Sequence, residues 1–256
     1  PNGHPDIHNI DDLLDSLARI RRITGKPVGF KMVLGFSDWL DELGETIHRR
    51  GMEYAPDFIT IDSADGGTGA APQSLMDYVG LPLRRSLPLV VDKLNEYHLR
   101  DRVKVIASGK MINPAEAAWA LCVGADFIVS ARGFMFALGC IQALQCNKNT
   151  CPTGITTHNP ELQRGLVPQD KAKRVANYAK NLMHEVGVIA HSCGVREARS
   201  LQRKHVYLID ERGVPEPLSD RYPDQTPRPE YLIATESAPP HVSAPHETRL
   251  NEAAQE

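Results

Sequence analysis

Four short apolar runs between Lys26 and Leu144 constrain the fold of this chain more than any other sequence feature. The runs are PVGFKMV (27–33), DFITIDS (57–63), VKVIAS (103–108) and DFIVSA (126–131). Short runs rich in Val and Ile are typical of strands buried on both faces of a parallel sheet. The stretches between them indicate amphipathic helices, one with Ser37 as its N-cap and another beginning at Pro114. This alternation predicts βαβ units and an α/β fold.

The number of such units is half of what a complete (β/α)8 barrel requires, since that barrel has eight and about 250 residues. Beyond Gly154 the pattern predicts helices at 170–190 and 194–204 and a last strand at HVYLID. Eight of the nineteen prolines fall between Pro215 and Pro245, which predicts an extended or disordered tail. We therefore divide the chain into a lead-in helix, four βα units, a cysteine-containing loop, a helical segment and a Pro-rich tail, at 1–25, 26–145, 140–158, 159–212 and 213–256.

Composition and charge argue against several classes of protein. A formal charge of −3 gives no reason to expect a nucleic-acid partner or an anionic membrane surface. No apolar run approaches the roughly 18 residues of a membrane span, and the N-terminus has no signal-peptide pattern. Five unevenly spaced cysteines do not form a secreted disulfide framework. We expect a cytoplasmic protein, and the start at Pro1 rather than Met indicates a fragment or a processed product.

Small, polar or glycine-rich segments follow three of the predicted strands. They are ADGGTGAAP (64–72), SGK (108–110) and SARG (130–133). Loops at the C-terminal ends of parallel strands bind ligands in α/β folds, and their exposed N–H groups beside a Lys or Arg can hold a phosphate. Tight turns alone are the alternative explanation. Neither GxxxxGK[ST] nor GxGxxG is present, so a P-loop and a dinucleotide fingerprint are not supported.

Lys31 is a cation inside the first apolar run. Its ammonium can lie at the mouth of a ligand site, where it would stabilise negative charge or hold a carboxylate. The alternative is a lysine that extends from the edge of the sheet into water. Asp62 and Asp65 flank the glycine-rich loop and can orient a substrate or ammonium, although carboxylates in such turns more often cap backbone N–H groups.

Several of these segments resemble one known family. GKPVGFKMV, DFITIDSADGGTGAAP, LRDRVKVIASGK and ADFIVSARGFMFALGCIQALQC with NTCPTGI closely resemble the FMN-binding domain of glutamate synthase, above all its stand-alone, archaeal-type members. The resemblance runs from about Gly25 to Ala190. It implies the C-terminal half of a (β/α)8 TIM barrel with parallel strands, followed by helices and the Pro-rich tail, and it makes the four units strands five to eight.

The resemblance also implies roles for individual residues. FMN would lie at the C-terminal ends of the strands, its phosphate surrounded by Ser108, Gly109, Lys110, Ser130, Ala131 and Arg132. The isoalloxazine ring and the 2-oxoglutarate site would lie near Lys31, Gly66, Gly67, Thr68 and Gly69. Lys31 and Asp65 are the candidate catalytic residues.

Three of the five cysteines, Cys140, Cys146 and Cys151, fall within twelve positions. In glutamate synthases three cysteines with this spacing bind a 3Fe-4S cluster, which is held through thiolates. Two alternatives stay open: three unrelated thiols, and a zinc site completed by His158. Cys122 and Cys193 are predicted to be packing residues.

The function implied is an FMN- and iron–sulfur-dependent oxidoreductase of glutamate biosynthesis, which reduces 2-iminoglutarate, formed from 2-oxoglutarate and ammonia, to glutamate. Implied partners are a redox partner (a ferredoxin or an NAD(P)H-oxidising subunit), a glutaminase subunit and the N-terminal half of the barrel. A glutaminase of the glutamate synthase type uses an N-terminal cysteine as its nucleophile. This chain has no cysteine before Cys122, so the resemblance implies that glutaminase activity comes from another subunit. Two alternatives are an FMN oxidoreductase of another substrate and a non-catalytic half-barrel subunit whose exposed first strand needs a partner.

Overall fold

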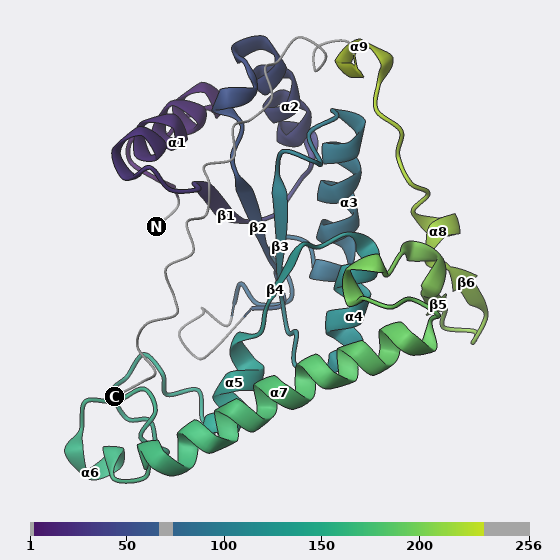
Figure 1. Ribbon diagram of the computed structural model, residues 1–256. Coiled ribbons are helices and arrows are strands. Elements are labelled where there is room, and N and C mark those ends of the chain that lie inside the picture. The colour runs from purple at the N-terminus through teal and green to yellow at the C-terminus, as the bar shows by residue number, and fades with distance from the viewer. Residues whose placement is uncertain (1–2, 67–73, 233–256) are drawn as a thin grey trace, which may run out of the picture.

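A computed structural model describes residues 3–66 and 74–232 and contains one four-stranded parallel sheet (Figure 1). Its strands are β1 (Gly29–Val33), β2 (Phe58–Asp62), β3 (Lys104–Ser108) and β4 (Phe127–Val129). Each strand lies within one of the four apolar runs, so the prediction of an α/β fold with a parallel sheet is confirmed.

The strands follow one another in the order β1-β2-β3-β4, so each pairs with the next strand along the chain. The register runs from Gly29 opposite Phe58 to Val33 opposite Asp62 in the first pair. A doubly wound sheet would reverse its order at a switch point, whereas consecutive order is that of neighbouring strands in a (β/α)8 barrel. The described residues therefore form part of a barrel, with four of its strands.

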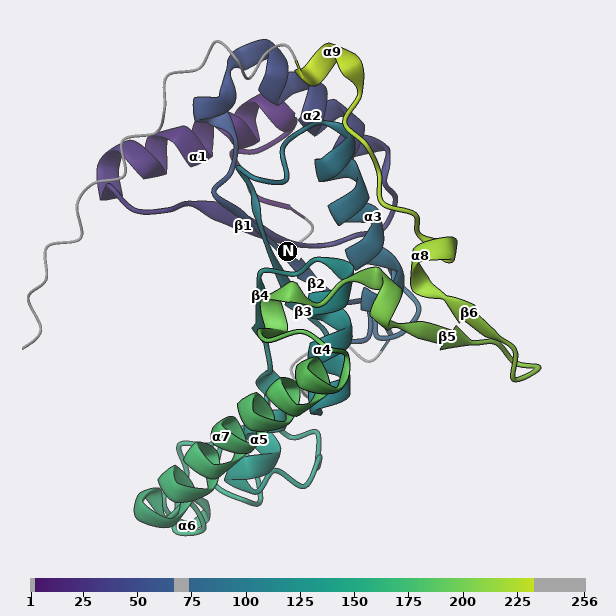
Figure 2. The same cartoon turned by 45° about the vertical axis from the view of Figure 1, so that its right-hand side comes forward.

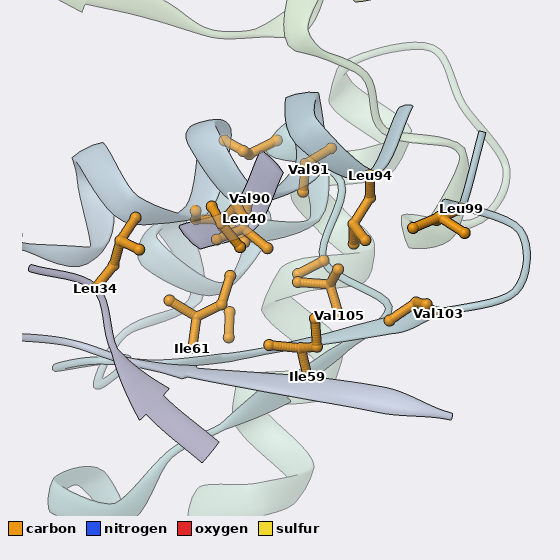
Figure 3. Packing of buried hydrophobic residues seen from close by; sticks show 14 of the residues in the cluster. Leu34, Leu40, Ile59, Ile61, Val90, Val91, Leu94, Leu99, Val103 and Val105 are labelled. Carbon is orange, nitrogen blue, oxygen red and sulfur yellow. The ribbon is translucent and has the colours of Figure 1, made fainter. Parts of the chain in front are cut away.

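One face of the sheet carries the hydrophobic core. The helices that pack there are α1 (Ile10–Thr24), α2 (Asp38–Arg50), α3 (Leu83–Glu96) and α4 (Pro114–Val123). Figure 3 shows Ile59, Ile61 and Val105 pointing from the strands toward the helix that carries Val90 and Leu94. These side chains are fully or almost fully buried. Each such aliphatic side chain contributes about 1.5–3 kcal/mol when buried, so this interface holds the helices on the sheet.

The opposite face of the sheet is exposed in the described part of the chain. Side chains alternate between the two faces of a strand, so Lys31 and Val33 share this face with Thr60 and Asp62. Apolar side chains here are half exposed: 48% for Val33, 51% for Phe127 and 42% for Val129. The sequence predicted strands buried on both faces, and the structure buries only the helix-covered one.

Helix caps follow local chemistry. Asn113 caps α4 in a capping box with Glu116, and Pro114 occupies its first turn as predicted. Ser37 holds the N-cap position of α2, but its side chain makes no capping hydrogen bond.

After β4 the chain forms α5 (Ala131–Leu138), α6 (Pro160–Gln163) and the long helix α7 (Pro168–Ser192), which packs against α4 and α5 (Figures 1 and 2). The helix predicted at 170–190 is therefore confirmed. No helix in the described ranges is both long and apolar enough to cross a membrane.

The helix predicted at 194–204 is wrong. This segment makes only two single 3-10 turns, η2 (Ala198–Ser200) and η3 (Arg203–His205). Gly194 adopts a φ of 77°, a left-handed conformation that ends α7. Leu201 then packs against Cys122 and Ala190 in a small second core. These tertiary contacts outweigh the local helical preference.

The strand predicted at HVYLID is present as β5 (Tyr207–Ile209), but it lies outside the main sheet. It pairs in antiparallel fashion with β6 (Pro215–Pro217), and the hairpin projects to one side in Figure 2.

The prediction of a disordered tail from residue 213 does not hold for residues 213–232. This segment contains β6, α8 (Leu218–Arg221) and α9 (Pro229–Leu232). Arg228 Nε donates to Glu96 Oε1 at 2.8 Å, and the Tyr231 ring stacks on His48 with centroids 4.2 Å apart. These few side-chain contacts hold the segment on α2 and α3. The Pro-rich composition of the segment gave no sign of them. Residues 233–256 lie outside the described residues.

Arg203 lies at the centre of these C-terminal contacts and yields a stability prediction. Its side chain is 4% exposed, with Nη2 2.6 Å from Asp92 Oδ1 and Nη1 donating to Tyr222 O at 2.8 Å. Arg203→Ala is expected to lower the free energy of unfolding by about 3–5 kcal/mol, because the Asp92 carboxylate, which is only 16% exposed, loses its counterion. Burial already raises the pKa of Asp92 despite that counterion.

Urea unfolding followed by circular dichroism measures this loss. Arg212→Ala is the matched control, since Arg212 is 82% exposed in its pair with Asp210. The control is expected to change stability by no more than about 1 kcal/mol. Equal losses in the two variants would contradict a structural role for the Arg203–Asp92 pair.

Candidate active site

Polar side chains from three strands meet at the C-terminal edge of the sheet, on its exposed face. Lys31 Nζ from β1 lies 2.8 Å from Asp62 Oδ2 of β2. Ser108 Oγ, at the end of β3, donates to Asp62 Oδ1 at 3.3 Å. The parallel register places Val33 opposite Asp62, so Lys31 reaches diagonally across the strand pair. Asp62 therefore links all three strands through its carboxylate.

Lys31 keeps access to solvent although it is paired. Its side chain is 60% exposed and that of Asp62 is 36% exposed. A cation on the open face can approach a ligand bound at the strand ends, so the catalytic role of Lys31 stays a prediction. The partnership with Asp62 was missed by the sequence reasoning. Its signal was the alternation of Thr60 and Asp62 with the buried Ile59 and Ile61, which marks a polar face of β2.

The loop after β2 is held by Asp65. Its Oδ2 accepts a hydrogen bond from Ser63 Oγ, and Ser63 Oγ in turn accepts from Leu83 N at 3.1 Å. Asp65 Oδ1 lies 3.7 Å from Lys110 Nζ. These contacts favour a role for Asp65 in fixing the loop, while its predicted catalytic role stays a prediction. Gly66 has a φ of 71°. The predicted ligand residues Gly67, Thr68 and Gly69 lie outside the described residues.

The loop after β3 packs tightly against the loop after β2. A Cβ on Gly109 would lie 2.5 Å from Ser63 Cβ, so only glycine fits there. Lys110 has a left-handed backbone with φ of 48°, and its Nζ lies 3.0 Å from Asp77 Oδ1. The ammonium proposed for the phosphate is thus held between the carboxylates of Asp65 and Asp77.

The loop after β4 leads into α5. Ser130 is the N-cap residue, yet its side chain makes no capping hydrogen bond, and Ala131 is the exposed first residue of the helix. Ser130 Oγ lies instead 3.0 Å from Tyr178 Oη on α7. The backbone N–H groups at the start of α5 have no side-chain cap, which suits an anion such as the FMN phosphate. No sequence signal singled out Tyr178.

Cys140, Cys146 and Cys151 line one small cavity of about 50 Å³, here called the cysteine cavity. Arg132, in the first turn of α5, lines the same cavity. The cavity wall is otherwise mainly apolar, with Met135, Phe136, Ile141, Ala143, Leu144 and Pro152. The three thiols that the sequence had grouped only by spacing therefore lie on the wall of one cavity.

Cys151 has the environment of a thiolate. Its Sγ lies 3.4 Å from Thr153 Oγ1. Burial raises the pKa of this thiol, but hydrogen bonds from Thr153 and the Thr156 backbone outweigh burial and lower the pKa to about 6. A thiolate is the form of cysteine that binds metals and iron–sulfur clusters. Cys151 thus has the protonation state that a cluster ligand requires, and the cluster itself stays a prediction.

The three thiols line the cavity without converging on one point, which bears on the cluster and on the zinc alternative alike. Across the described ranges, no three His, Cys, Asp or Glu side chains come close enough together to hold a metal ion. His158 does not line the cysteine cavity; it is exposed, and its backbone N–H donates to Asn149 Oδ1. His158 is therefore not placed to act as the fourth ligand of a zinc site with the three cysteines.

The two remaining cysteines are packing residues, as predicted. Cys122 is buried in the second core, with Cys193 packed against it. Burial raises the pKa of Cys122 to about 12, so its thiol stays protonated.

Comparison with known proteins finds a matching family and several related chains. The family description "Conserved region in glutamate synthase" matches residues 1–196. The glutamate synthase large subunit-like protein YerD of Bacillus subtilis (strain 168) is 41% identical over 213 residues, which are 83% of this chain and 40% of YerD. Archaeal glutamate synthase (NADPH) of Methanocaldococcus jannaschii is 33% identical over 204 residues, which are 79% of this chain and 39% of that protein.

The chain thus spans about two fifths of the length of these two relatives. Among solved structures, a mutant flavocytochrome b2 with pyruvate bound superposes with a TM-score of 0.46 at 14% identity. The superposition covers 94% of this chain and 46% of that one.

Proposed function

The chain belongs to the glutamate synthase family, and from this premise we propose that it forms part of an oxidoreductase that makes glutamate from 2-oxoglutarate and ammonia. The observation that supports this most directly is the convergence of Lys31, Asp62 and Ser108 on the exposed face at the C-terminal ends of three strands. In barrels this edge is where catalysis takes place.

FMN is the cofactor that we propose for this edge. The residues that would hold its phosphate are Ser108, Gly109, Lys110, Ser130, Ala131 and Arg132, through backbone N–H groups and two cations. Gly109 fits because a side chain there would clash with Ser63, and α5 fits because no side chain caps it. When bound, FMN supplies the hydride that reduces 2-iminoglutarate, and the cluster supplies single electrons.

Lys31 would hold the substrate or stabilise negative charge beside the flavin. Its ammonium lies on the exposed face, and Asp62 keeps it at the strand end by a 2.8 Å contact. Such a preorganised charge needs no reorganisation when charge develops on the reacting groups.

A 3Fe-4S cluster is the second cofactor that we propose, with Cys140, Cys146 and Cys151 as its ligands. The shared cavity and the lowered pKa of Cys151 favour this assignment, and the three thiols would have to move closer together to bind the cluster. Arg132, which lines the same cavity, would place a positive charge between the cluster and the flavin phosphate.

The N-terminal half of the barrel is the first partner that we propose. It would cover the exposed face, where Val33, Phe127 and Val129 are half exposed and the edge strands β1 and β4 have no further strand beside them in the described ranges. A redox partner and a glutaminase subunit complete the set. The same exposed face supports one other candidate, a half-barrel subunit that is not catalytic by itself.

Anaerobic purification of the protein with its barrel assembled tests the proposal. FMN, iron and acid-labile sulfide are assayed together with the visible absorption spectrum. We expect all three components, and addition of 2-oxoglutarate with ammonia should reoxidise the reduced protein. FMN without such reoxidation would assign the protein to another substrate, and absence of both cofactors would favour the non-catalytic subunit.

A further inference from the structure

We propose that Tyr178 is a positioning residue for the flavin phosphate: its hydroxyl joins the two phosphate-holding loops and keeps the Ser130 hydroxyl away from the start of α5. The inference rests on the proposed function, since it requires the FMN phosphate to bind between the loops that follow β3 and β4.

One hydroxyl group contacts both loops. Tyr178 Oη lies 2.6 Å from Ile112 O, in the loop after β3, and 3.0 Å from Ser130 Oγ, in the loop after β4. Tyr178 itself belongs to α7, which packs against α5. The spacing between the two loops is therefore set from a third element, 66 residues beyond Ile112 and 48 beyond Ser130.

The protons in this chain of hydrogen bonds can be assigned. A carbonyl oxygen only accepts, so the single Tyr178 hydroxyl proton is donated to Ile112 O. The Ser130 hydroxyl must then donate its own proton to Tyr178 Oη. Ser130 Oγ–H is thus committed to Tyr178 and is not free to donate to a phosphate. A phosphate at this loop would be bound by backbone N–H groups rather than by the Ser130 side chain.

The same contact explains why α5 has no side-chain cap. A serine at an N-cap position normally accepts hydrogen bonds from the first backbone N–H groups of the helix. Ser130 makes no such bond, because its side chain is turned toward Tyr178. Without Tyr178 the Ser130 oxygen could cap these N–H groups and compete with an anion for them.

Packing holds Tyr178 in this place. Its ring meets the Phe134 ring edge-on, with centroids 5.0 Å apart. A Cβ on Gly133 would lie 1.9 Å from Tyr178 Oη, so the close approach of α7 to α5 requires glycine at 133. The hydroxyl therefore has a fixed position relative to the start of α5.

Comparing the binding of FMN with that of riboflavin, which lacks the phosphate, distinguishes a role of Tyr178 at the phosphate from a general loosening of the protein. Fluorescence titration of the apoprotein, with its barrel assembled, measures both affinities. Tyr178→Phe removes one oxygen and keeps the ring against Phe134. It is expected to weaken FMN binding about tenfold, the scale of one lost hydrogen bond plus competition from the freed Ser130 hydroxyl. Riboflavin affinity should change less than about twofold.

Ser130→Ala gives a second, independent measurement. It removes a hydroxyl that donates away from the phosphate, so FMN binding should weaken less than in Tyr178→Phe. In the Ser130→Ala background, Tyr178→Phe should cost less than it does alone, because no side chain is left to cap α5. Tyr207→Phe is the control, since Tyr207 is exposed on β5, away from the site, and should leave both affinities unchanged.

Three outcomes would overturn the inference. FMN binding unchanged in Tyr178→Phe, or FMN and riboflavin weakened equally, would show that the hydroxyl does not act through the phosphate. A wild-type protein that binds FMN no more tightly than riboflavin would mean that the loops do not hold a phosphate. That last result refutes the proposed phosphate site as well, whereas the first two leave it standing.

Discussion

Lys31→Ala is expected to slow the reoxidation of reduced protein by 2-oxoglutarate and ammonia about a hundredfold, the cost of losing one preorganised charge stabiliser. Lys31 is the cation that Asp62 holds at 2.8 Å on the exposed face of the sheet. Anaerobic stopped-flow absorbance at the flavin band measures the rate. Lys31→Arg should restore the rate only in part, because a planar guanidinium places its charge differently from an ammonium.

Two further variants show whether the position of the charge matters. Asp62→Asn keeps the ammonium but weakens its anchor, so a smaller slowing than in Lys31→Ala is expected. Lys104→Ala is the matched control: Lys104 lies on β3 at the opposite end of the sheet, where Nζ donates to Asp101 O. If Lys31→Ala reacts as fast as wild type, or if Lys104→Ala is equally slow, the role of Lys31 at the reacting groups is refuted.

Cys146→Ser is expected to remove most bound iron and the broad visible absorption, because a cluster with three cysteine ligands has no spare thiolate. Cys140, Cys146 and Cys151 line the same cavity, but in the described residues their side chains do not converge on one metal position, so the assignment depends on this measurement. Iron and sulfide assays on anaerobically prepared protein, with electron paramagnetic resonance of the oxidised form, measure the loss.

Cys193→Ser serves as the control, because Cys193 packs against the second core and does not line the cysteine cavity. It should retain its iron. Full iron content in Cys146→Ser would refute the assignment of this loop as a cluster site. Loss of iron in both variants would indicate a general failure to fold.

The local pattern of apolar residues was sufficient to predict the four strands of the sheet. The four apolar runs predicted β1 to β4, and the spacing between them left room for the helices that cover one face. The same pattern could not tell which faces are covered. It treated Val33 and Phe127 like Ile59, yet the first two are half exposed and Ile59 is fully buried. Burial depends on which element packs opposite, and residue type alone does not specify that.

The failures in the C-terminal third have a common cause. The segment 194–204 has helical composition, and residues 213–232 have the composition of a disordered tail. Both are instead held by single arginines that reach distant carboxylates, Arg203 to Asp92 and Arg228 to Glu96. The average composition of a short sequence window does not reveal such contacts, because each one depends on a single arginine and a partner far away in the chain.

The sequence by itself determined the four strands, the long helix at 170–190 and the grouping of three cysteines, because these depend on residues a few positions apart. The tertiary structure alone decided which polar groups meet. Lys31 pairs with Asp62 through strand register, and Ser130 meets Tyr178 through the packing of α7 on α5. His158 does not line the cysteine cavity although it follows Cys151 closely in the chain. Contacts of this kind arise only when helices pack on the sheet, since packing alone sets the distances between side chains far apart in sequence.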